Sequence, residues 1–348
     1  MFVLLMLSAL KLQATTLLEP PGLSGTLVVV NKSDNTVSFI DVGSAKIIGT
    51  LPTGKGPHEL IISEDGKWAV STDFVGGDSL TVFDIENMKV ARTIPLPKYP
   101  GPHGISFLPS KLSSKNDTVV FTSGKSQHVG IANIHTGLVS DGIKTAQNTT
   151  HMLAIDHQDK ALYTTNIRSN TITQIDLQKA AVLRHIKTDA TPEAININQA
   201  KRQLWYGANQ NGLVTVLDLT SKKELAKFKG FSFPYRVLFS PSDKQAIVPD
   251  FRNHNVRFFD VYTLKEIGTL ALEEGAGPQG ITLHRHVSET GNLKPSGQYA
   301  NQEVAYLSLN LKNKVVSIDI NTQKIIATFP TGNNPDGVGH SPLVLTQD

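Results

Sequence analysis

The chain has 348 residues, no cysteine, 18% charged residues and a formal net charge of +3. The lack of cysteine excludes disulfides, thiolate metal sites, iron–sulfur clusters and a cysteine nucleophile. The composition is neither that of a disordered chain nor that of a membrane protein, and no apolar run is long enough for a transmembrane span. Lysines and arginines are scattered without a block of like charge, which argues against a nucleic-acid-binding surface.

Residues 1–14 are expected to be a signal peptide. Residues 2–10 are apolar and the segment ends on Leu12-Gln13-Ala14, as in the hydrophobic core and cleavage end of an export signal, although its one basic residue is Lys11. We therefore predict an exported protein, whether periplasmic, secreted or on the cell surface. A leader is expected over 15–24 and a folded domain over 25–345. The alternative is a disordered or lipid-facing tail.

One pattern recurs seven times along the chain: an alternating apolar strand ends on Asp or Asn, and a turn follows. The terminal residues are Asp41, Asp84, Asn133, Asp176, Asp218, Asp260 and Asp319. Their separations are 43, 49, 43, 42, 42 and 59 residues, which is close to the period of a four-stranded propeller blade. We expect these side chains to cap backbone groups of the turns.

A second pattern, usually a proline followed by polar residues, recurs in phase with the first. Its copies begin at Pro57, Pro102, Thr150, Pro192, Pro234, Pro278 and Pro335. Each unit holds four short strands, a to d, which in the second unit are expected at 60–63, 67–72, 79–84 and 90–94. No helical periodicity of useful length is present. The sequence therefore predicts an all-β fold, a single seven-bladed β-propeller of four-stranded antiparallel blades.

The two ends of the chain complement each other. The first unit has strands b, c and d, at 27–30, 37–41 and 47–51, but no strand a, and the last mark is followed only by a strand a at 338–345. We therefore expect the ring to be closed by a blade shared between the N- and C-termini, which covers its open edges. The two separations that exceed the period, 49 and 59 residues, predict insertions at 112–117 and 287–303, both between strands a and b.

Several segments resemble the YVTN-type propeller repeat. The resemblance is carried by residues 35–41 with Leu51-Pro52-Thr53-Gly54, and again by 313–319 with 328–332. Over residues 25–345 the chain resembles YncE-like propellers and the propeller of cytochrome-d1-like proteins. This resemblance implies an exported or cell-surface seven-bladed propeller. It implies no single function, because related propellers serve as lactonases, amine dehydrogenase subunits, haem d1 carriers, surface-layer modules and DNA binders.

Propeller topology predicts where a site would lie. Strand a lines the central channel, so the first residues of each strand a form a ring at one mouth, and the ends of strand b lie on the same face. This ring differs from blade to blade, which favours a ligand site over a purely structural ring. The candidate ligand-binding residues are His58, Glu59, Asp73, His103, His151, Glu193, Tyr235, Arg236, Asp250, Gln279 and Asp336, with His340 further along the last strand a.

The histidines of the ring are candidate metal ligands. His58, His103 and His151 come from adjacent units and could bind copper, zinc or iron, with Glu59 or Glu193 completing the set. The alternative is that each histidine is only a turn residue hydrogen-bonded to nearby backbone. Two further histidines, His284 and His286, are expected at the surface of the opposite face.

The catalytic residues are not assigned by any motif, and the candidates are Glu59, Glu193 and Arg236. The two glutamates could act as an acid–base pair, although their blades are not adjacent. Arg236 could bind a carboxylate or phosphate, or form a salt bridge with Asp250 or Glu193. There is no Gly-rich phosphate loop and no Gly-x-Ser-x-Gly elbow.

The sequence leaves three functions open. The first is binding of a small ligand, a cofactor or a protein partner at the polar mouth of the channel. The second is an enzyme that uses the same residues, with or without a metal, as a lactonase or other hydrolase, a lyase or an oxidoreductase. The third and least favoured is a DNA-binding propeller, which would need a basic face.

Overall fold

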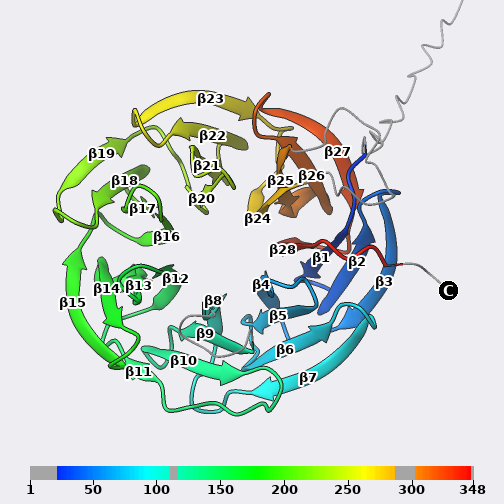
Figure 1. Cartoon of the computed structure of the whole chain (residues 1–348), viewed down its shortest axis with the longest axis horizontal. Helices are drawn as coiled ribbons and strands as arrows, with labels where there is room; N and C mark the ends of the chain where they lie inside the picture. Colours follow the sequence, from blue (N-terminus) through cyan, green and yellow to red (C-terminus); the bar gives the residue numbers. More distant parts are fainter. Residues whose placement is uncertain (1–21, 110–116, 287–301, 346–348) are drawn as a thin grey trace, which may run out of the picture.

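The computed structural model describes residues 22–109, 117–286 and 302–345. The predicted signal peptide lies outside the described residues, as do most of the predicted leader and most of the two predicted insertions. Seven four-stranded antiparallel sheets stand as blades around a central channel (Figure 1). The predicted seven-bladed β-propeller is thus confirmed.

Each blade runs from strand a at the channel to strand d at the rim. The first three blades are β4 (Pro57–Ile62), β5 (Trp68–Asp73), β6 (Ser79–Asp84) and β7 (Lys89–Pro95); β8 (Pro102–Phe107), β9 (Thr118–Ser123), β10 (His128–Asn133) and β11 (Ile143–Lys144); and β12 (Thr150–Asp156), β13 (Ala161–Asn166), β14 (Thr171–Asp176) and β15 (Ala181–Lys187). The next three are β16 (Pro192–Asn198), β17 (Gln203–Ala208), β18 (Leu213–Asp218) and β19 (Glu224–Phe228); β20 (Leu238–Phe239), β21 (Gln245–Asp250), β22 (Asn255–Asp260) and β23 (Lys265–Ala271); and β24 (Pro278–Arg285), β25 (Glu303–Leu309), β26 (Lys314–Asp319) and β27 (Lys324–Pro330).

The seventh blade joins the two ends of the chain. It consists of β28 (Pro335–Ser341), β1 (Thr26–Asn31), β2 (Thr36–Asp41) and β3 (Lys46–Pro52). β28 pairs antiparallel with β1, with Val29 opposite Val338, so the predicted shared blade is confirmed. In the blades of β4 and β28, strand a begins three residues earlier than predicted, at the proline of the second mark. Among the described residues the helices are two short 3₁₀ turns, η1 (Ile167–Ser169) and η2 (Asn310–Lys312), and no helix there is long and apolar enough to span a membrane.

The turns between strands c and d share one geometry. In the third blade, the carboxylate of Asp176 accepts hydrogen bonds from the backbone N–H groups of Gln178 and Lys179, both at 2.9 Å. The fourth residue after each strand-c Asp or Asn then has a positive φ. These residues are Ala45, Met88, Gly137, Ala180, Lys222, Leu264 and Gln323. The capping role predicted for the first repeat is therefore confirmed, since the side chains satisfy N–H groups that the turn leaves unpaired.

The core lies between the faces of neighbouring blades. Trp205 of β17 is fully buried, stacks on Phe228 with ring centroids 5.4 Å apart, and contacts the edge of Phe259 in the next blade. Each aromatic side chain buries a large apolar area and fixes the spacing of the sheets. Trp68 is the first residue of β5, two positions earlier in strand b than Trp205, and it is only partly buried and contacts His135 at the rim.

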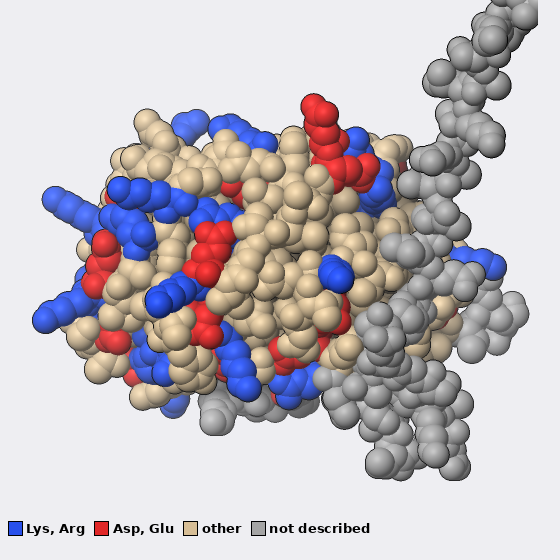
Figure 2. All heavy atoms as spheres, turned by 90° about the horizontal axis from the view of Figure 1, so that it is seen from above, with Lys and Arg blue, Asp and Glu red and all other residues tan. Residues whose placement is uncertain are grey.

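Charged side chains of both signs alternate on the outer wall. Figure 2, which views the ring from its side, shows lysine and arginine side chains interspersed with aspartate and glutamate. A nucleic-acid interface requires a continuous basic footprint. This face does not carry one.

Candidate functional site

The turn before strand a places the ring residues. In six blades the residue before the second mark has a positive φ, and the candidate side chain lies two positions later. These turn residues are Gly56, Gly101, Thr149, Thr191, Gly277 and Asn334, and the corresponding side chains are His58, His103, His151, Glu193, Gln279 and Asp336. A positive φ reverses the chain at the channel mouth, so one local geometry brings six different side chains to the same ring.

The residues after this turn form a bulge in the pairing of strands a and b. In β4, for example, the register shifts between Pro57 and Leu60, so that His58 and Glu59 leave the regular ladder. The backbone N–H of Glu59 is instead hydrogen-bonded to Thr72 Oγ1 at 3.1 Å. Bulges redirect side chains next to functional sites. Here the bulge lets one residue face the mouth while the next faces the channel.

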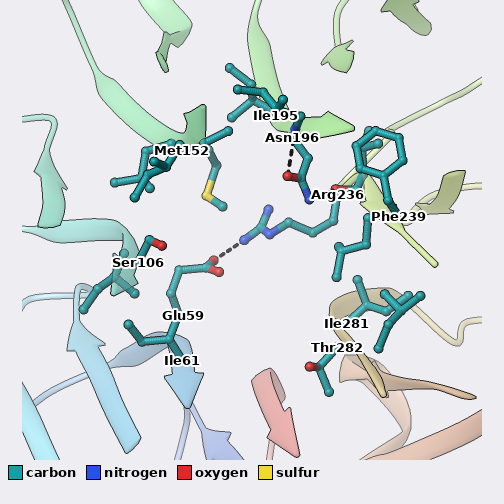
Figure 3. A pocket seen from close by; sticks show the side chains of 18 of the residues that line it. Glu59, Ile61, Ser106, Met152, Ile195, Asn196, Arg236, Phe239, Ile281 and Thr282 are labelled. Atoms are coloured by element: carbon teal, nitrogen blue, oxygen red, sulfur yellow. Dashed lines mark hydrogen bonds and ion pairs between the residues drawn. The ribbon is translucent and has the colours of Figure 1, made fainter. Parts of the chain in front are cut away.

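Glu59 and Arg236 are the charged side chains at the channel-facing position. Glu59 precedes the regular part of β4, and Arg236 occupies the same repeat position in the blade of β20, across the channel. The Arg236 guanidinium donates a hydrogen bond to Glu59 Oε1 and forms an ion pair with it (Figure 3). Burial alone would raise the pKa of Glu59, but Arg236 and then His58 lower it to about 2. Glu59 is therefore ionised at neutral pH, and Arg236 is its counter-ion.

The ion pair forms the polar end of a cavity in the channel. The cavity has a volume of about 500 Å³ and is lined mainly by aliphatic side chains of the inner strands. Besides Glu59 and Arg236, its polar lining side chains include Ser106, Asn196 and Thr282 (Figure 3). A cavity of this size with aliphatic walls and several convergent polar groups is typical of small-molecule sites.

The three ring histidines lie against one another. The ring centroids of His103 and His151 are 3.6 Å apart in a stacked arrangement, and His58 lies 4.4 Å from His103. The side chain of Phe74, which follows β5, makes edge contacts with His58 and His103 at 5.2 and 4.6 Å. Burial and the neighbouring imidazoles hold the pKa of His103 well below its usual value. His103 is therefore neutral at physiological pH.

Carboxylates flank the other two histidines. His58 Nδ1 lies 3.2 Å from Glu59 Oε1, and its Nε2 lies 3.4 Å from Asp336 Oδ2. The fully buried Asp336 also pairs with Lys32 Nζ at 2.6 Å. His58 therefore lies between carboxylates that come from two neighbouring blades.

His151 forms a second carboxylate–imidazole pair. Its Nε2 lies 3.7 Å from Glu193 Oε1, and Asn209 donates a hydrogen bond of 2.6 Å to Glu193 Oε2. Burial would raise the pKa of Glu193, but His151 and Arg236 bring it below its usual value. Glu59 and Glu193 bind different partners, so the structure does not join them as the acid–base pair considered from the sequence.

The predicted metal site is only partly assembled. His58, Glu59 and His103 can bring one ligand atom each to within 4.8 Å of one another, whereas His151 is outside this set. His103 Nδ1 is buried without a hydrogen-bond partner among the described residues. However, Glu59 is already paired with Arg236, and a cation at this position would have to share that carboxylate. The histidine trio remains a prediction as a metal site.

Other predicted ring residues are used inside their own blades. Asp73 accepts hydrogen bonds from Ser79 Oγ and Thr81 Oγ1, and Asp250 accepts two from the backbone N–H groups of Ser232 and Phe233. Neither aspartate lines the cavity. Arg236 therefore pairs with Glu59 and not with Asp250 or Glu193, the two partners considered from the sequence. Gln279 and Tyr235 are buried at the ring, and the Arg236 guanidinium lies over the Tyr235 ring.

One expectation about histidines is wrong. His284 and His286 lie on the face opposite the ring, as predicted, but they are not surface residues, because His286 is buried and His284 is half-buried. His340, further along the last strand a as predicted, stacks on His284 with ring centroids 3.9 Å apart. The expectation failed because the far end of β24 packs against β28 rather than facing solvent.

Sequence reasoning also missed Lys32 and Phe74. Both directly follow the last residue of strand b, at Asn31 and Asp73. Because the ends of strand b are predicted to lie on the ring face, the residue after each of these ends also belongs to that face. Lys32 and Phe74 could have been predicted in this way. Lys32 brings a second cation to the cluster, and Phe74 covers the histidines.

Comparison with known proteins identifies the family. Residues 118–336 match the family described as lactonase, 7-bladed beta-propeller. The chain belongs to this lactonase-type propeller family. No curated protein matches its sequence, and the narrower resemblance to YVTN-repeat or YncE-like propellers stays a prediction.

Solved structures agree with the fold. Hydrazine synthase of Kuenenia stuttgartiensis aligns with a TM-score of 0.67 and 16% identity, over 90% of this chain and 99% of that one. A functionally unknown protein from Desulfotomaculum acetoxidans aligns with a TM-score of 0.72 and 12% identity, over 91% and 99%. At these identities the likeness concerns the fold alone.

Proposed function

We propose that this propeller binds a small lactone, or the hydroxy acid formed from it, in the cavity of the central channel and hydrolyses the lactone. The observation that carries the proposal is the buried Arg236, paired with Glu59, at one end of a cavity with mainly aliphatic walls. Membership in a family described as lactonase supports the substrate class. A lactone has a carbon ring and one carbonyl group, which matches a cavity with aliphatic walls and a guanidinium at one end.

Arg236 supplies the electrostatic part of the proposed reaction. Its guanidinium can bind the carbonyl oxygen and stabilise the negative charge that develops when water attacks the carbonyl carbon. The same guanidinium can bind the carboxylate of the product through two parallel N–H donors. Because the site is buried, each of these interactions is stronger than it would be in water.

Glu59 is the proposed acceptor of the water proton. While it is paired with Arg236 its low pKa makes it a weak base. A ligand oxygen on Arg236 would weaken this pair, and the pKa of the buried carboxylate would then rise. Water oxygen bonds to the carbonyl carbon, its proton goes to Glu59, and the ring C–O bond breaks. The departing ring oxygen takes up the proton, and His58 at 3.2 Å orients the carboxylate.

The test combines turnover with binding. Acid release from δ-valerolactone and γ-butyrolactone is followed at constant pH, and calorimetry measures binding of 5-hydroxypentanoate and 4-hydroxybutyrate. We expect Glu59→Gln to abolish turnover but to retain or strengthen binding of the acids, because Arg236 loses its competing carboxylate. The double variant Glu59→Gln/Arg236→Gln should lose both functions without leaving a buried charge unpaired.

The matched control is Arg184→Gln, since Arg184 bonds to Gln174 on the outer part of its blade and is remote from the cavity. It should leave turnover and binding unchanged. Absence of both acid release and binding heat with wild-type protein would overturn the proposal.

A second function has its own support. The buried Arg236 guanidinium can hold an anionic ligand without any reaction if the ligand carboxylate takes the place of Glu59 in the ion pair. Binding heats for the hydroxy acids, lost in the double variant and unaccompanied by acid release from either lactone, would favour this binding role over catalysis.

Export remains part of the proposal. It is supported by the apolar character of residues 2–10. A reporter enzyme active only outside the cytoplasm, fused after residue 24, should become active. A reporter that stays inactive, while an established signal peptide activates it, would contradict export.

A further inference from the structure

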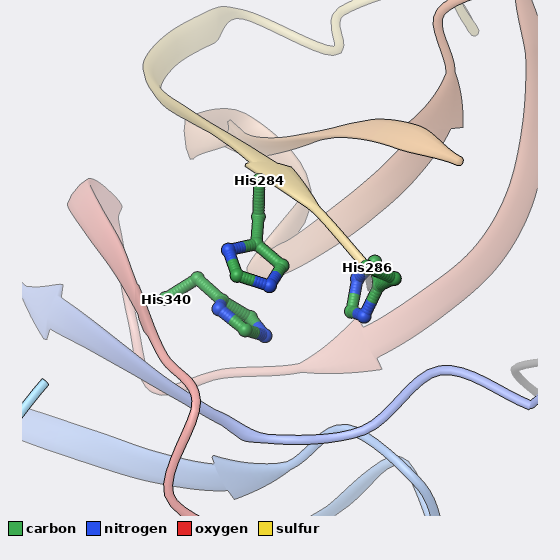
Figure 4. Close-up of side chains that lie close together, drawn as sticks. All are labelled: His284, His286 and His340. Atoms are coloured by element: carbon green, nitrogen blue, oxygen red, sulfur yellow. The ribbon is translucent and has the colours of Figure 1, made fainter. Parts of the chain in front are cut away.

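Three histidines meet at the end of the channel opposite the ring. His284 lies on β24, His286 follows that strand, and His340 lies on β28 (Figure 4). His284 is five residues beyond the ring residue Gln279 of its strand, and His340 is four residues beyond Asp336. At about 3.3 Å per residue this places them roughly 13–17 Å from the mouth ring. The cluster is therefore separate from the ring histidines and from the Glu59–Arg236 pair, although its cavity shares Thr282 and Val338 with the proposed lactone cavity.

The imidazoles are close enough to share one ion. Ring centroids are 3.9 Å apart for His284 and His340, 4.7 Å for His284 and His286, and 5.3 Å for His286 and His340. One nitrogen from each ring lies within 4.8 Å of the other two. Nitrogen ligands of a tetrahedral ion are about 3.3 Å apart, as follows from bonds of about 2.0–2.1 Å. Small side-chain rotations suffice to reach that spacing.

Hydrogen bonds to the outer nitrogens prepare two of the rings for coordination. His340 Nε2 lies 3.0 Å from the carbonyl oxygen of Ser24, so it must carry the proton and donate. The lone pair is then on His340 Nδ1, which is buried and has no hydrogen-bond partner among the residues the structure describes. His286 Nε2 is bonded to the hydroxyl of buried Tyr306 at 2.9 Å. Ligating histidines usually hold such an outer partner.

The three side chains are shielded from water, since His286 and His340 are buried and His284 is half-buried. Arg285, which lies between His284 and His286 in the sequence, is paired with Glu303 at 2.6 Å. At the ring, by contrast, the candidate ligand Glu59 is itself paired with Arg236.

We propose that His284, His286 and His340 bind one divalent first-row transition-metal ion, such as zinc, copper, nickel or cobalt. Imidazole nitrogens favour these ions over calcium and magnesium, which take oxygen ligands. His284 and His340 also line a cavity of about 410 Å³ formed with β4 and β28. Three protein ligands leave a fourth position open in a tetrahedral site. Water or a small molecule in this cavity would complete the coordination.

The test uses the full chain without a polyhistidine tag, stripped with a chelator. It is titrated with Co²⁺, whose visible absorption reports nitrogen coordination, and then with Zn²⁺ in competition. We expect one equivalent to bind and to raise the melting temperature. His284→Ala and His340→Ala should each weaken binding by at least ~100-fold. His284 is half-buried, so its variant decides the question should His340→Ala fail to fold.

Two controls locate the ion. His185→Ala removes an exposed histidine of β15, and His58→Ala removes a ring histidine. Both should retain the tight site. The proposal is overturned if wild-type protein binds neither ion below about 100 µM, if His284→Ala keeps full affinity, or if His58→Ala alone removes the ion. The readouts do not depend on lactone turnover, so this result is independent of the proposed function.

Discussion

Glu59 and Arg236 hold the same position of the repeat in blades on opposite sides of the ring, and their side chains form an ion pair across the channel. At this position the other blades have Gly104, Met152, Ala194, Gly280 and Gly337. The two charged residues are thus the exceptions in an otherwise small or apolar layer. They join distant parts of the chain and make one end of the cavity polar.

The first prediction concerns the stability of this pair. Arg236→Met should lower the free energy of unfolding by about 3–5 kcal/mol, because it leaves a buried carboxylate without its counter-ion. Adding Glu59→Gln should recover most of that loss, since the remaining groups are neutral. Urea unfolding of the two single variants, the double variant and the wild type completes the cycle.

Glu273→Gln is the control for this cycle. Glu273 pairs with Lys314 at 2.5 Å, but Glu273 is exposed and Lys314 only half-buried, so its replacement should cost less than about 1 kcal/mol. If Arg236→Met cost no more than this control, the Glu59–Arg236 pair would not be buried as described.

The second prediction concerns the buried Asp73. Burial raises its pKa to about 6, against hydrogen bonds from Ser79 and Thr81 that lower it. The folded protein therefore holds this proton more tightly than the unfolded chain, and wild-type stability falls as pH rises from about 4 to about 6. Asp73→Asn removes the charge. It should be more stable than wild type by roughly 1–3 kcal/mol at pH 7 and nearly equal below pH 4.

Unfolding free energies measured from pH 3.5 to pH 7.5 check this. The gap between Asp73→Asn and wild type should open between pH 4 and 6 and stay constant above. A gap of the same size at every pH would show that hydrogen bonding rather than charge sets the effect.

The architecture could be predicted because it repeats. Seven strand-c ends and seven strand-a starts fixed the blade count, and the unmatched strand near Pro335 identified the closing blade. Partners across the channel could not be predicted in this way. Which of Asp250, Glu193 and Glu59 reaches Arg236 depends on the bulge and on the diameter of the ring. Neither of these can be derived from the residues next to Arg236 in the sequence. The His284 cluster was missed for a related reason, since it forms only where the far ends of two inner strands meet.

The third prediction concerns close approach of inner strands. A Cβ on Gly280 would meet the backbone carbonyl of Asp336 in the neighbouring strand a. Because backbone cannot move aside as a flexible side chain does, Gly280→Ala should lower stability by about 1–3 kcal/mol. Gly43→Ala is the matched control. The nearest atom to its added Cβ is a side-chain oxygen of Asp41 at 3.6 Å, so stability should change by less than about 1 kcal/mol.

Thermal and urea unfolding compare the two glycine variants. Equal effects of Gly280→Ala and Gly43→Ala would contradict the described packing of β24 against β28. A loss of stability in Gly280→Ala but not in Gly43→Ala would show why glycine is required in the second repeat mark. The reason would be the close spacing of neighbouring inner strands rather than turn geometry.

The fourth prediction concerns Glu193, whose pKa is lowered by His151 and Arg236 in spite of burial. A lowered pKa means that the ionised form stabilises the fold above the unfolded pKa near 4.5, and that this stability is lost as pH falls. Glu193→Gln should therefore be less stable than wild type at pH 7 by about 1.5–3 kcal/mol, the range for hydrogen bonds to a charged group.

The difference should shrink as pH falls below 4.5, which is the opposite of the dependence expected for Asp73→Asn. Glu64→Gln, at an exposed position, is the control and should match wild type at both ends of the range. Unfolding at pH 3.5 and pH 7 separates the explanations. A Glu193→Gln deficit that is as large at pH 3.5 as at pH 7 would mean that Asn209 and packing, rather than the ionised carboxylate beside His151, account for its contribution.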